Sequence, residues 1–464
     1  MIAYTKVLPL VCGVALGMLA ADRAFTSYAD AKTVLDQPSD LVPAELRNSN
    51  QAKWRAWSQR QDRAIRARLQ QGDLDSMVNL LLYGTSFTKQ PRIKVEVLTE
   101  AAKAGILRAR VDDLVAGLRS PGDNERLVFL NGLLRSQGID PASPGETGVF
   151  IYNNLQRVLQ EVSILATRAE EAKRLVIPDA AQPDAVPDPA AIFNWRPGLL
   201  RDRGVSLDTG IFPNFSIELA LRDLKNRGLL REGQVARVAV IGPGLDFSDK
   251  NEQTSFDYYP QQTLQPFALY DSLVRLGLAR SNEVSMSIFD ISPRVIDHIQ
   301  RARERARSSA GMPNTGYVIQ LPRDPTSSWP SDLVAFWRSL GDRVGAEVAP
   351  ITAPSDLPSL ETRAVRIRPD VVLSLHPVDL NIVLERISLA EADRFDLMLG
   401  TNIFIYYDAF ERSLALENAG AMLKRGGLLL TNDKLPEVPG GSMRLGGVTD
   451  VPYNRDAVGW YQKQ

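Results

Sequence analysis

The sequence predicts an α/β fold built on a mostly parallel, Rossmann-like sheet, preceded by an all-helical N-terminal domain. Short, β-branched apolar runs such as residues 236–242 are typical of strands buried on both faces, as in parallel sheets. Between residues 213 and 464 such runs alternate with helical patterns, which indicates a parallel sheet covered by helices. Within residues 46–176 the apolar residues recur at helical spacing.

Bulk composition narrows the classes of function. A chain of 464 residues predicts two or three domains, and a net charge of -1 gives no reason to expect a nucleic-acid partner. Cys12 is the single cysteine, and His298 and His376 are the two histidines. An intrachain disulfide and a thiolate metal site are therefore excluded. We expect no metal centre, and a mixed carboxylate site remains the alternative.

The N-terminal 21 residues have the pattern of an export signal. Lys6 precedes an apolar run over residues 7–21, and small residues around Ala20 and Ala21 suit cleavage. The run is shorter than the ~20 apolar residues of a membrane span. We expect export to the periplasm of a bacterial cell. An uncleaved anchor, with membrane association through residues 7–21, and a misassigned start with a cytoplasmic protein remain open.

Residues 22–45 are polar and are predicted to be a tether before the helical domain of residues 46–176. In that domain Trp54, Trp57 and Ile65 lie on one helical face, Gly72 is expected to end the helix, and Asp75 to cap the next one. Further helices are predicted over residues 92–106, 124–138 and 147–176. Five prolines between residues 178 and 197 place a semi-rigid linker, and the main domain boundary, at residues 177–212.

The C-terminal domain, residues 213–464, is predicted element by element. Strands are expected at residues 236–242, 283–290, 370–375, 394–400 and 426–433, with two closing antiparallel strands at 442–450 and 456–463. Helices are expected at residues 213–230, 264–278, 292–307 and 408–423. In the last of these, Asp408 and Glu411 are spaced as a capping box. Residues 311–365, approximately, form an insertion.

Residues with chemistry stand where the predicted strands end. The first strand is followed by Gly242 and Gly244, the second ends at Asp290, the third near residues 376–379, and the fourth at Thr401 and Asn402. Ligands of open parallel sheets bind outside these carboxyl ends. The two glycines permit close approach of the backbone to a ligand, and the Asp290 carboxylate can accept both hydroxyl hydrogens of a ribose. A nucleoside-bearing cofactor is the expected ligand.

The glycine motif discriminates between such cofactors. The third glycine of a dinucleotide fingerprint is missing, and a long polar segment, residues 246–263, separates the motif from the next helix. A pyrophosphate would therefore meet no helix N-terminus, which disfavours a nicotinamide or flavin dinucleotide. S-adenosylmethionine, which lacks phosphate, is disfavoured less. A nicotinamide oxidoreductase would share Gly242 and Asp290 but leaves residues 402–407 unexplained.

Residues 394–433 resemble the class I S-adenosylmethionine-dependent methyltransferases, and most narrowly the chemotaxis receptor glutamate methyltransferase family. The matching residues are Phe395-Asp396-Leu397-Met398, Thr401-Asn402, Ile405-Tyr406-Tyr407 and Gly426-Gly427. The resemblance implies a Rossmann-like methyltransferase sheet and S-adenosylmethionine as cofactor, bound by Gly242, Gly244, Asp290 and, next to the adenine, Asp379. Thr401 stands where that family has arginine, so glutamate methylation is not implied.

The resemblance also implies catalytic roles. Asn402 would orient the acceptor or the methionine end of the cofactor, and Tyr406 or Tyr407 would close the methyl pocket. Asp246, Asp257 and His376 are candidate bases. A plain turn for Asn402 and a core position for each tyrosine remain alternatives. Two functions follow: methyl transfer to an unidentified small-molecule or protein acceptor, or a catalytically inactive, exported binding protein that retains the fold, since S-adenosylmethionine is made in the cytoplasm.

Overall fold

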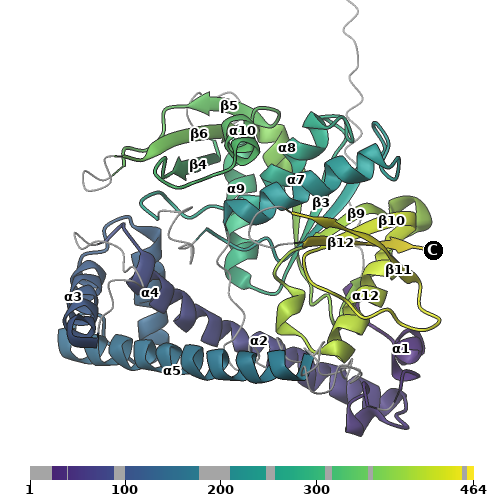
Figure 1. Ribbon diagram of the computed structural model, residues 1–464, viewed down its shortest axis with the longest axis horizontal. Helices are drawn as coiled ribbons and strands as arrows, with labels where there is room; N and C mark the ends of the chain where they lie inside the picture. Colours follow the sequence, from purple (N-terminus) through teal and green to yellow (C-terminus); the bar gives the residue numbers. More distant parts are fainter. Residues whose placement is uncertain are drawn as a thin grey trace, which may run out of the picture.

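The computed structural model describes residues 23–38, 40–87, 100–176, 210–246, 257–308, 316–353, 359–451 and 457–464. The export signal, the first part of the helix predicted at residues 92–106 and most of the linker at 177–212 lie outside these ranges. In Figure 1 a twisted sheet with its helices occupies one side of the molecule, and long helices run beneath it toward a small bundle at the other side.

The central sheet has seven strands in the order β11-β12-β10-β9-β2-β3-β7. Strands β7, β3, β2, β9 and β10 are mutually parallel, while β12 runs antiparallel to both β10 and β11. The bounds are β2 Arg237–Ile241, β3 Ser285–Asp290, β7 Leu375–Asp379, β9 Phe395–Gly400, β10 Leu423–Thr431, β11 Met443–Asp450 and β12 Ala457–Lys463. The mostly parallel sheet with an antiparallel closing strand is confirmed.

Helices cover both faces of this sheet. Along β2, Val238 and Val240 belong to one apolar core and Ala239 and Ile241 to the other, because successive side chains of a strand point to opposite faces. The first core is completed by α7 (Ile211–Asn226), α8 (Gln265–Arg275), α9 (Pro293–Ser308) and α11 (Pro369–Leu373). The second is completed by α1 (Tyr28–Leu35) and α12 (Ala409–Met422), and α12 begins with the predicted capping box.

A second, smaller sheet lies within the stretch predicted as an insertion. It consists of β4 (Val318–Arg323), β5 (Gly345–Val348) and β6 (Glu361–Ile367) in the antiparallel order β4-β6-β5, with α10 (Ser331–Ser339) packed beside it. Leu321, Trp337 and Val365 join the first core, so this sheet is anchored to the central one rather than projecting freely.

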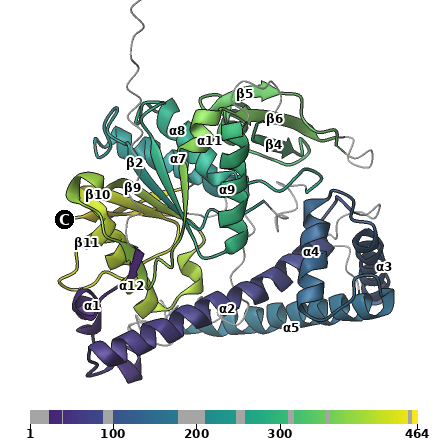
Figure 2. The same cartoon turned by 180° about the vertical axis from the view of Figure 1, so that it is seen from behind.

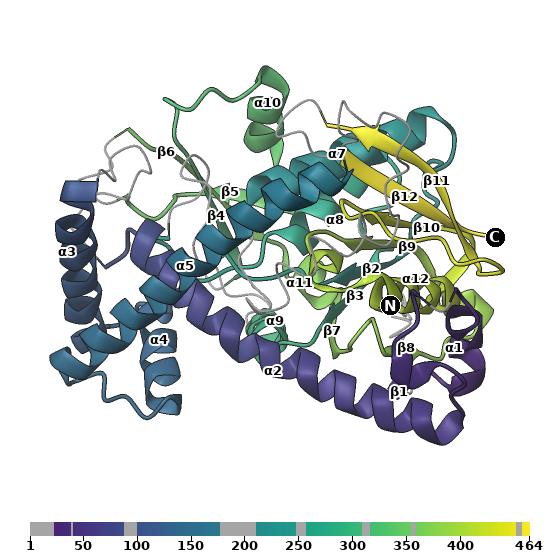
Figure 3. The same cartoon turned by 60° about the horizontal axis from the view of Figure 1, so that its bottom comes forward.

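Helix α2 (Gln51–Tyr83) links the two parts of the molecule, and Figure 3 shows it passing beneath the sheet. Trp54 and Ile65 lie in the second core of the sheet domain, whereas Met77 and Leu80 lie in a third core. The third core also contains residues of α3 (Glu100–Arg119), α4 (Glu125–Ser136) and α5 (Pro144–Val176). A short 3-10 turn, η1 (Ala44–Leu46), precedes α2.

Three local expectations were wrong. Gly72 does not end a helix and Asp75 caps none: both lie inside α2, where Asp75 pairs with Arg157 of α5 at 2.6 Å. A glycine inside a helix costs only about 1 kcal/mol, which packing against two cores outweighs. The strand predicted at residues 370–375 begins only at Leu375, as β7, because Pro369 at the first turn starts α11.

The segment predicted as a tether is also folded. Strand β1 (Arg23–Phe25) pairs antiparallel with β8 (Glu385–Ile387), and Ala31 and Val34 of α1 are buried in the second core. Two short 3-10 turns, η4 (Glu391–Asp393) and η5 (Phe404–Tyr406), flank β9. Among the residues described, no helix has the length and apolarity needed to cross a membrane.

We predict that Trp57→Ala destabilises the sheet domain by about 3–5 kcal/mol, because Trp57 is 4% exposed, stacks on Trp54 at 5.3 Å and meets Phe410 of α12 at 5.6 Å. Urea unfolding measures the change. Tyr152→Ala on α5, where the side chain is 42% exposed, is the control and should stay within about 0.5 kcal/mol. Equal effects of the two substitutions would contradict the placement of α2 in the sheet core.

Candidate functional site

The carboxyl ends of the central parallel strands meet at one edge of the sheet. Ile241 of β2 lies opposite Phe289 of β3 and Gly400 of β9, and Asp290 lies opposite Asp379 of β7. A cavity of about 40 Å³ opens there. It is lined by Ile241, Gly242, Gly244, Phe289, Asp290, Ile291, Leu380, Ile382, Ile403, Tyr406 and Tyr407.

Gly242 and Gly244 both adopt left-handed backbone conformations, with φ of +61° and +70°. Side chains other than glycine are strained there, which accounts for both glycines. A Cβ on Gly242 would lie 2.1 Å from Cδ1 of Ile403, so the isoleucine fills the space beside the glycine. The sequence predicted close approach of a ligand to this backbone, and in the structure the Ile403 side chain lies there.

Asp290 is the buried polar group of this edge, with 6% of its surface exposed. Burial raises the pKa of its carboxyl to about 7, and the nearby Asp379 charge adds to the rise. Backbone N–H groups oppose it, since Ser292 N donates to Oδ1 of Asp290 at 2.8 Å. A carboxylate held at this cost at a strand end, beside a cavity, is typical of a functional site.

The segment after β9 forms the far wall of the cavity. Tyr406 lines it, and Tyr407 is 4% exposed, so that burial raises the pKa of its phenol. Arg412 of α12 holds the segment in place: its Nε donates to the carbonyls of Phe404 at 2.9 Å and Tyr407 at 2.8 Å. A buried cation therefore fixes the backbone of this wall.

The structure brings Gly242, Gly244, Asp290 and Tyr406 together but leaves Asn402 and Asp379 outside the cavity lining. Asn402 is exposed with φ +58°, and its side-chain oxygen accepts from Asn432 Nδ2 at 2.7 Å. The Asp379 side chain is 48% exposed and pairs with Arg66 at 2.8 Å.

Thr401 follows the end of β9, as predicted, but its side chain packs inside the protein. Its hydroxyl is buried and accepts from Gln265 Nε2 at 2.6 Å, so it holds α8 against the tip of β9.

None of the three candidate bases lines the cavity. Asp257 accepts hydrogen bonds from Thr85 and Ser86 after α2, and Oδ2 of Asp246 accepts from Gln262 at 2.7 Å. His376 lies within β7 opposite Ser287, and burial, with Arg303 and Arg307 nearby, lowers its pKa to about 4. Asp257 and Asp246 thus secure loops.

Helix α2 covers this edge of the sheet (Figure 3), a role that the sequence does not reveal. Asp62 accepts from Asn381 Nδ2 at 2.8 Å, Arg66 pairs with Asp379, and Arg68 donates to the carbonyl of Tyr406 at 3.0 Å. The contacts span more than 200 residues of sequence, and the basic residues of α2 otherwise look like an ordinary solvated face. Figure 2 shows the same crossing from behind.

The polar groups of this site suit a nucleoside cofactor, because two glycines with left-handed backbones and a buried carboxylate lie on neighbouring strand ends. The volume of the site does not suit such a cofactor. About 40 Å³ holds one or two waters, whereas ligand sites usually enclose about 300–1,000 Å³. In this conformation the cofactor therefore does not fit, and Ile403 is the side chain packed against Gly242. The residues described hold no group of acidic, histidine or cysteine side chains that suits a metal ion.

No family model and no curated protein matches the sequence. Among solved structures, a TehB-like SAM-dependent methyltransferase from Corynebacterium glutamicum matches with 11% identity and a TM-score of 0.23, over 54% of this chain and 98% of that one. The magnesium protoporphyrin IX methyltransferase from Synechocystis PCC 6803, with bound SAM, matches with 9% identity and a TM-score of 0.25, over 64% and 91%. The mitomycin 7-O-methyltransferase matches with 11% identity and a TM-score of 0.26, over 78% and 95%.

With identities and TM-scores this low, the fold rests on the strand order and directions of the sheet itself. These are the features of the predicted Rossmann-like sheet, mostly parallel and closed by an antiparallel strand.

We predict that Asp290→Asn stabilises the protein more at alkaline than at acid pH. The folded-state pKa, about 7, lies above the ordinary value of 3.8, so the folded protein binds this proton more tightly. The contribution of the bound Asp290 proton to the free energy of unfolding is complete below about pH 4 and is lost as the pH rises through about 7. Asparagine cannot ionise and keeps the acceptor for Ser292. Urea unfolding should show a gain that grows from about zero near pH 4 to at most about 4 kcal/mol near pH 8. A gain independent of pH would contradict this.

Proposed function

We propose that the chain is a methyltransferase-like protein of the class I S-adenosylmethionine-dependent superfamily. It binds S-adenosylmethionine at the tips of β2 and β3 and transfers the methyl group to a small-molecule or protein acceptor. The observation that carries this proposal is the position of Gly242, Gly244 and the buried Asp290 on neighbouring strand ends of a sheet with this order. Tyr406, on the opposite wall, excludes water from that edge.

Occupation of the site requires a conformational change, because the closed cavity does not admit the cofactor. The smallest change is movement of Ile403 away from Gly242, and Ile403 belongs to the wall that ends at Tyr407. The cofactor supplies an already activated methyl group, so the protein contributes position and exclusion of water rather than acid–base chemistry.

The narrower resemblance to the chemotaxis receptor methyltransferases supports the same fold and cofactor but no acceptor. Where that family has arginine, Thr401 is buried and bonded to Gln265, so no cation stands there to receive an acidic side chain. We therefore propose no glutamate acceptor. Asn402 retains its proposed catalytic role only if the segment after β9 moves and frees it from Asn432.

A second function is favoured by the closed cavity. A catalytically inactive descendant, exported and retained as a binding protein, would no longer need the space that Ile403 fills. Export, with or without membrane attachment through residues 7–21, belongs to the same proposal. A reporter fusion that distinguishes cytoplasm from periplasm tests it: a cytoplasmic signal contradicts export and removes the main objection to catalysis.

We predict that the purified full chain binds S-adenosylhomocysteine with a dissociation constant below about 1 mM, measured by calorimetry. Asp290→Ala should weaken binding by about tenfold or more, since a charged acceptor is lost. Asp450→Ala, at the exposed end of β11, is the matched control and should change nothing. Undiminished binding by folded Asp290→Ala would contradict the site, and no heat with the parent protein or with Ile403→Ala would contradict the enzyme.

We predict that Ile403→Ala tightens this binding. Opening the site moves three side-chain carbons of Ile403 out of an apolar contact, at about 0.8 kcal/mol each. The substitution removes them, so the affinity should rise by up to about fiftyfold. Val128→Ala, at an exposed aliphatic residue of α4, is the control. Weaker binding by Ile403→Ala than by the control would show that the isoleucine contacts the ligand instead of blocking it.

A further inference from the structure

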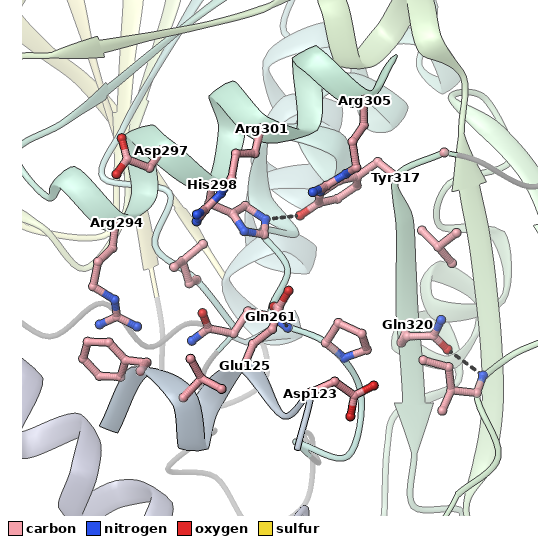
Figure 4. A pocket seen from close by; sticks show the side chains of 17 residues that line it. Asp123, Glu125, Gln261, Arg294, Asp297, His298, Arg301, Arg305, Tyr317 and Gln320 are labelled. Atoms are coloured by element: carbon pink, nitrogen blue, oxygen red, sulfur yellow. Dashed lines mark hydrogen bonds between the residues drawn. The ribbon is translucent and has the colours of Figure 1, made fainter. Parts of the chain in front are cut away.

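A larger cavity lies near the tip of β2 (Figure 4). Gly244 lines the small cavity, and its neighbour Leu245 lines the large one, which encloses about 680 Å³. Helix α9, strand β4, the start of α4 and the loop before α8 form its walls. Its volume lies in the range of sites for small organic ligands, about 300–1,000 Å³.

One face of α9 presents cations to this cavity. Arg294, Arg301 and Arg305 line it and lie one above the other, because they are separated by seven and four residues of helix. The charge of Arg294 is compensated within the protein, since this side chain pairs with Asp73 at 2.7 Å. The side chains of Arg301 and Arg305 are exposed and make no ion pair or hydrogen bond with any residue that the structure describes.

A buried histidine adds a neutral donor. The hydroxyl of Tyr317 accepts from Thr263 N at 2.7 Å and lies 2.8 Å from Nε2 of His298. With the Thr263 N–H donating to its oxygen, we assign the Tyr317 O–H as the donor to Nε2 of His298, which puts the histidine's own proton on Nδ1. Burial lowers the pKa of His298 to about 4, so this tautomer is neutral near pH 7. Within the described residues Nδ1 has no hydrogen-bond partner.

Two amide groups complete the donors. The side-chain oxygen of Gln320, a residue with 6% exposure that lines the cavity, accepts from Ile351 N at 3.1 Å, and its Nε2 has no partner in the described chain. Gln261 Nε2 is buried and likewise unpartnered. An unpaired buried donor costs about 1–3 kcal/mol, so a ligand that accepts from it is favoured.

Acidic residues lie mainly on the opposite wall. Figure 4 places Asp123 and Glu125, at the start of α4, across from Arg301 and Arg305. Glu125 is engaged, because its Oε2 accepts from Gln261 N at 2.9 Å. Asp297, on α9, lies at the end near Arg294. Helix α9 thus presents the cations and His298, and β4 presents Gln320, whereas Gln261 lies beside Glu125.

We propose that this cavity binds a small organic anion whose carboxylate or phosphate lies between Arg301 and Arg305, while the Nε2 group of Gln320 donates to the ligand from the wall formed by β4. The body of the ligand packs against Phe129 and Leu245, which line the same cavity. Guanidinium groups suit both anions, which they can bind through two parallel hydrogen bonds. The proposal goes beyond the proposed methyl transfer and does not depend on it.

The test uses the folded full chain and three probes that share an aromatic ring: phenyl phosphate, benzoate and the neutral benzyl alcohol. Calorimetry with each probe up to about 10 mM should show binding of at least one anion and none of the alcohol. The stronger anion identifies phosphate or carboxylate as the ligand group. Raised salt should weaken the binding, because exposed charges are screened.

Variants of α9 locate the binding. Arg301→Gln and Arg305→Gln should each weaken it about tenfold, as expected for loss of a charge-assisted hydrogen bond. Arg307→Gln, an exposed arginine of the same helix outside the cavity lining, is the matched control. Gln320→Glu keeps the acceptor for Ile351 and replaces the donor by a charge, so it should abolish anion binding.

Three outcomes would overturn the proposal: no anion binds, the alcohol binds as well as the anions, or Arg301→Gln and Arg305→Gln behave like Arg307→Gln. All three substituted arginines are exposed, so circular dichroism should show folded variants. Titration of S-adenosylhomocysteine into the same samples separates this result from the proposed function, since the α9 variants leave Gly242 and Asp290 untouched.

Discussion

The rest of the structure depends on the docking of one uninterrupted helix, α2, across the carboxyl edge of the sheet. Leu69, near its middle, packs against both cores of the sheet domain, while Arg66 pairs with Asp379 and with Glu385, whose side chain is 4% exposed. Ion pairs of this kind hold geometry better than surface pairs, because loss of one partner leaves a buried charge. A rigid helix anchored at one end fixes its other end, and so sets the bundle beside the sheet. There Arg126 of α4, 2% exposed, donates to the carbonyl of Asp246 at 2.8 Å.

The strand ends under α2 combine two features that oppose each other. The Asp290 carboxylate has the position of a ligand-binding acid, yet it is enclosed by aliphatic and aromatic side chains that penalise its charge. Apolar packing around Ile403 and Tyr407 stabilises the closed edge, while the buried acid destabilises it. A site that has to open tolerates such a conflict, and a site that has lost its ligand has no reason to keep the acid. The acid at Asp290 is therefore the residue on which the two proposed functions differ most.

The sequence predicted the sheet well, because alternation of short apolar runs with helices is a local signal, and the glycines and Asp290 were found because strand ends can be located from such runs. It failed where a local signal was overridden. Gly72 continues a helix that two cores support, and residues 370–375 follow a proline that favours a helix start. Asn402 is at a strand end as predicted, but its left-handed backbone and its bond to Asn432 turn it outward. Two features could not be predicted: the position of α2 over the strand ends, and the large cavity. Both depend on contacts between residues far apart in the chain, which leave no periodic pattern in a single sequence.

The two cavities share a partition at the loop of Gly244 and Leu245, because Gly244 lines the small cavity and Leu245 lines the large one. A ligand that shifts this partition while entering one cavity alters the shape of the other. The two occupancies are then thermodynamically linked, and the linkage is reciprocal: each ligand changes the affinity for the other by the same factor. Its sign is set by the direction in which the partition moves. Two glycines with left-handed backbones, at positions 242 and 244, place the most deformable part of the β2 tip at this boundary.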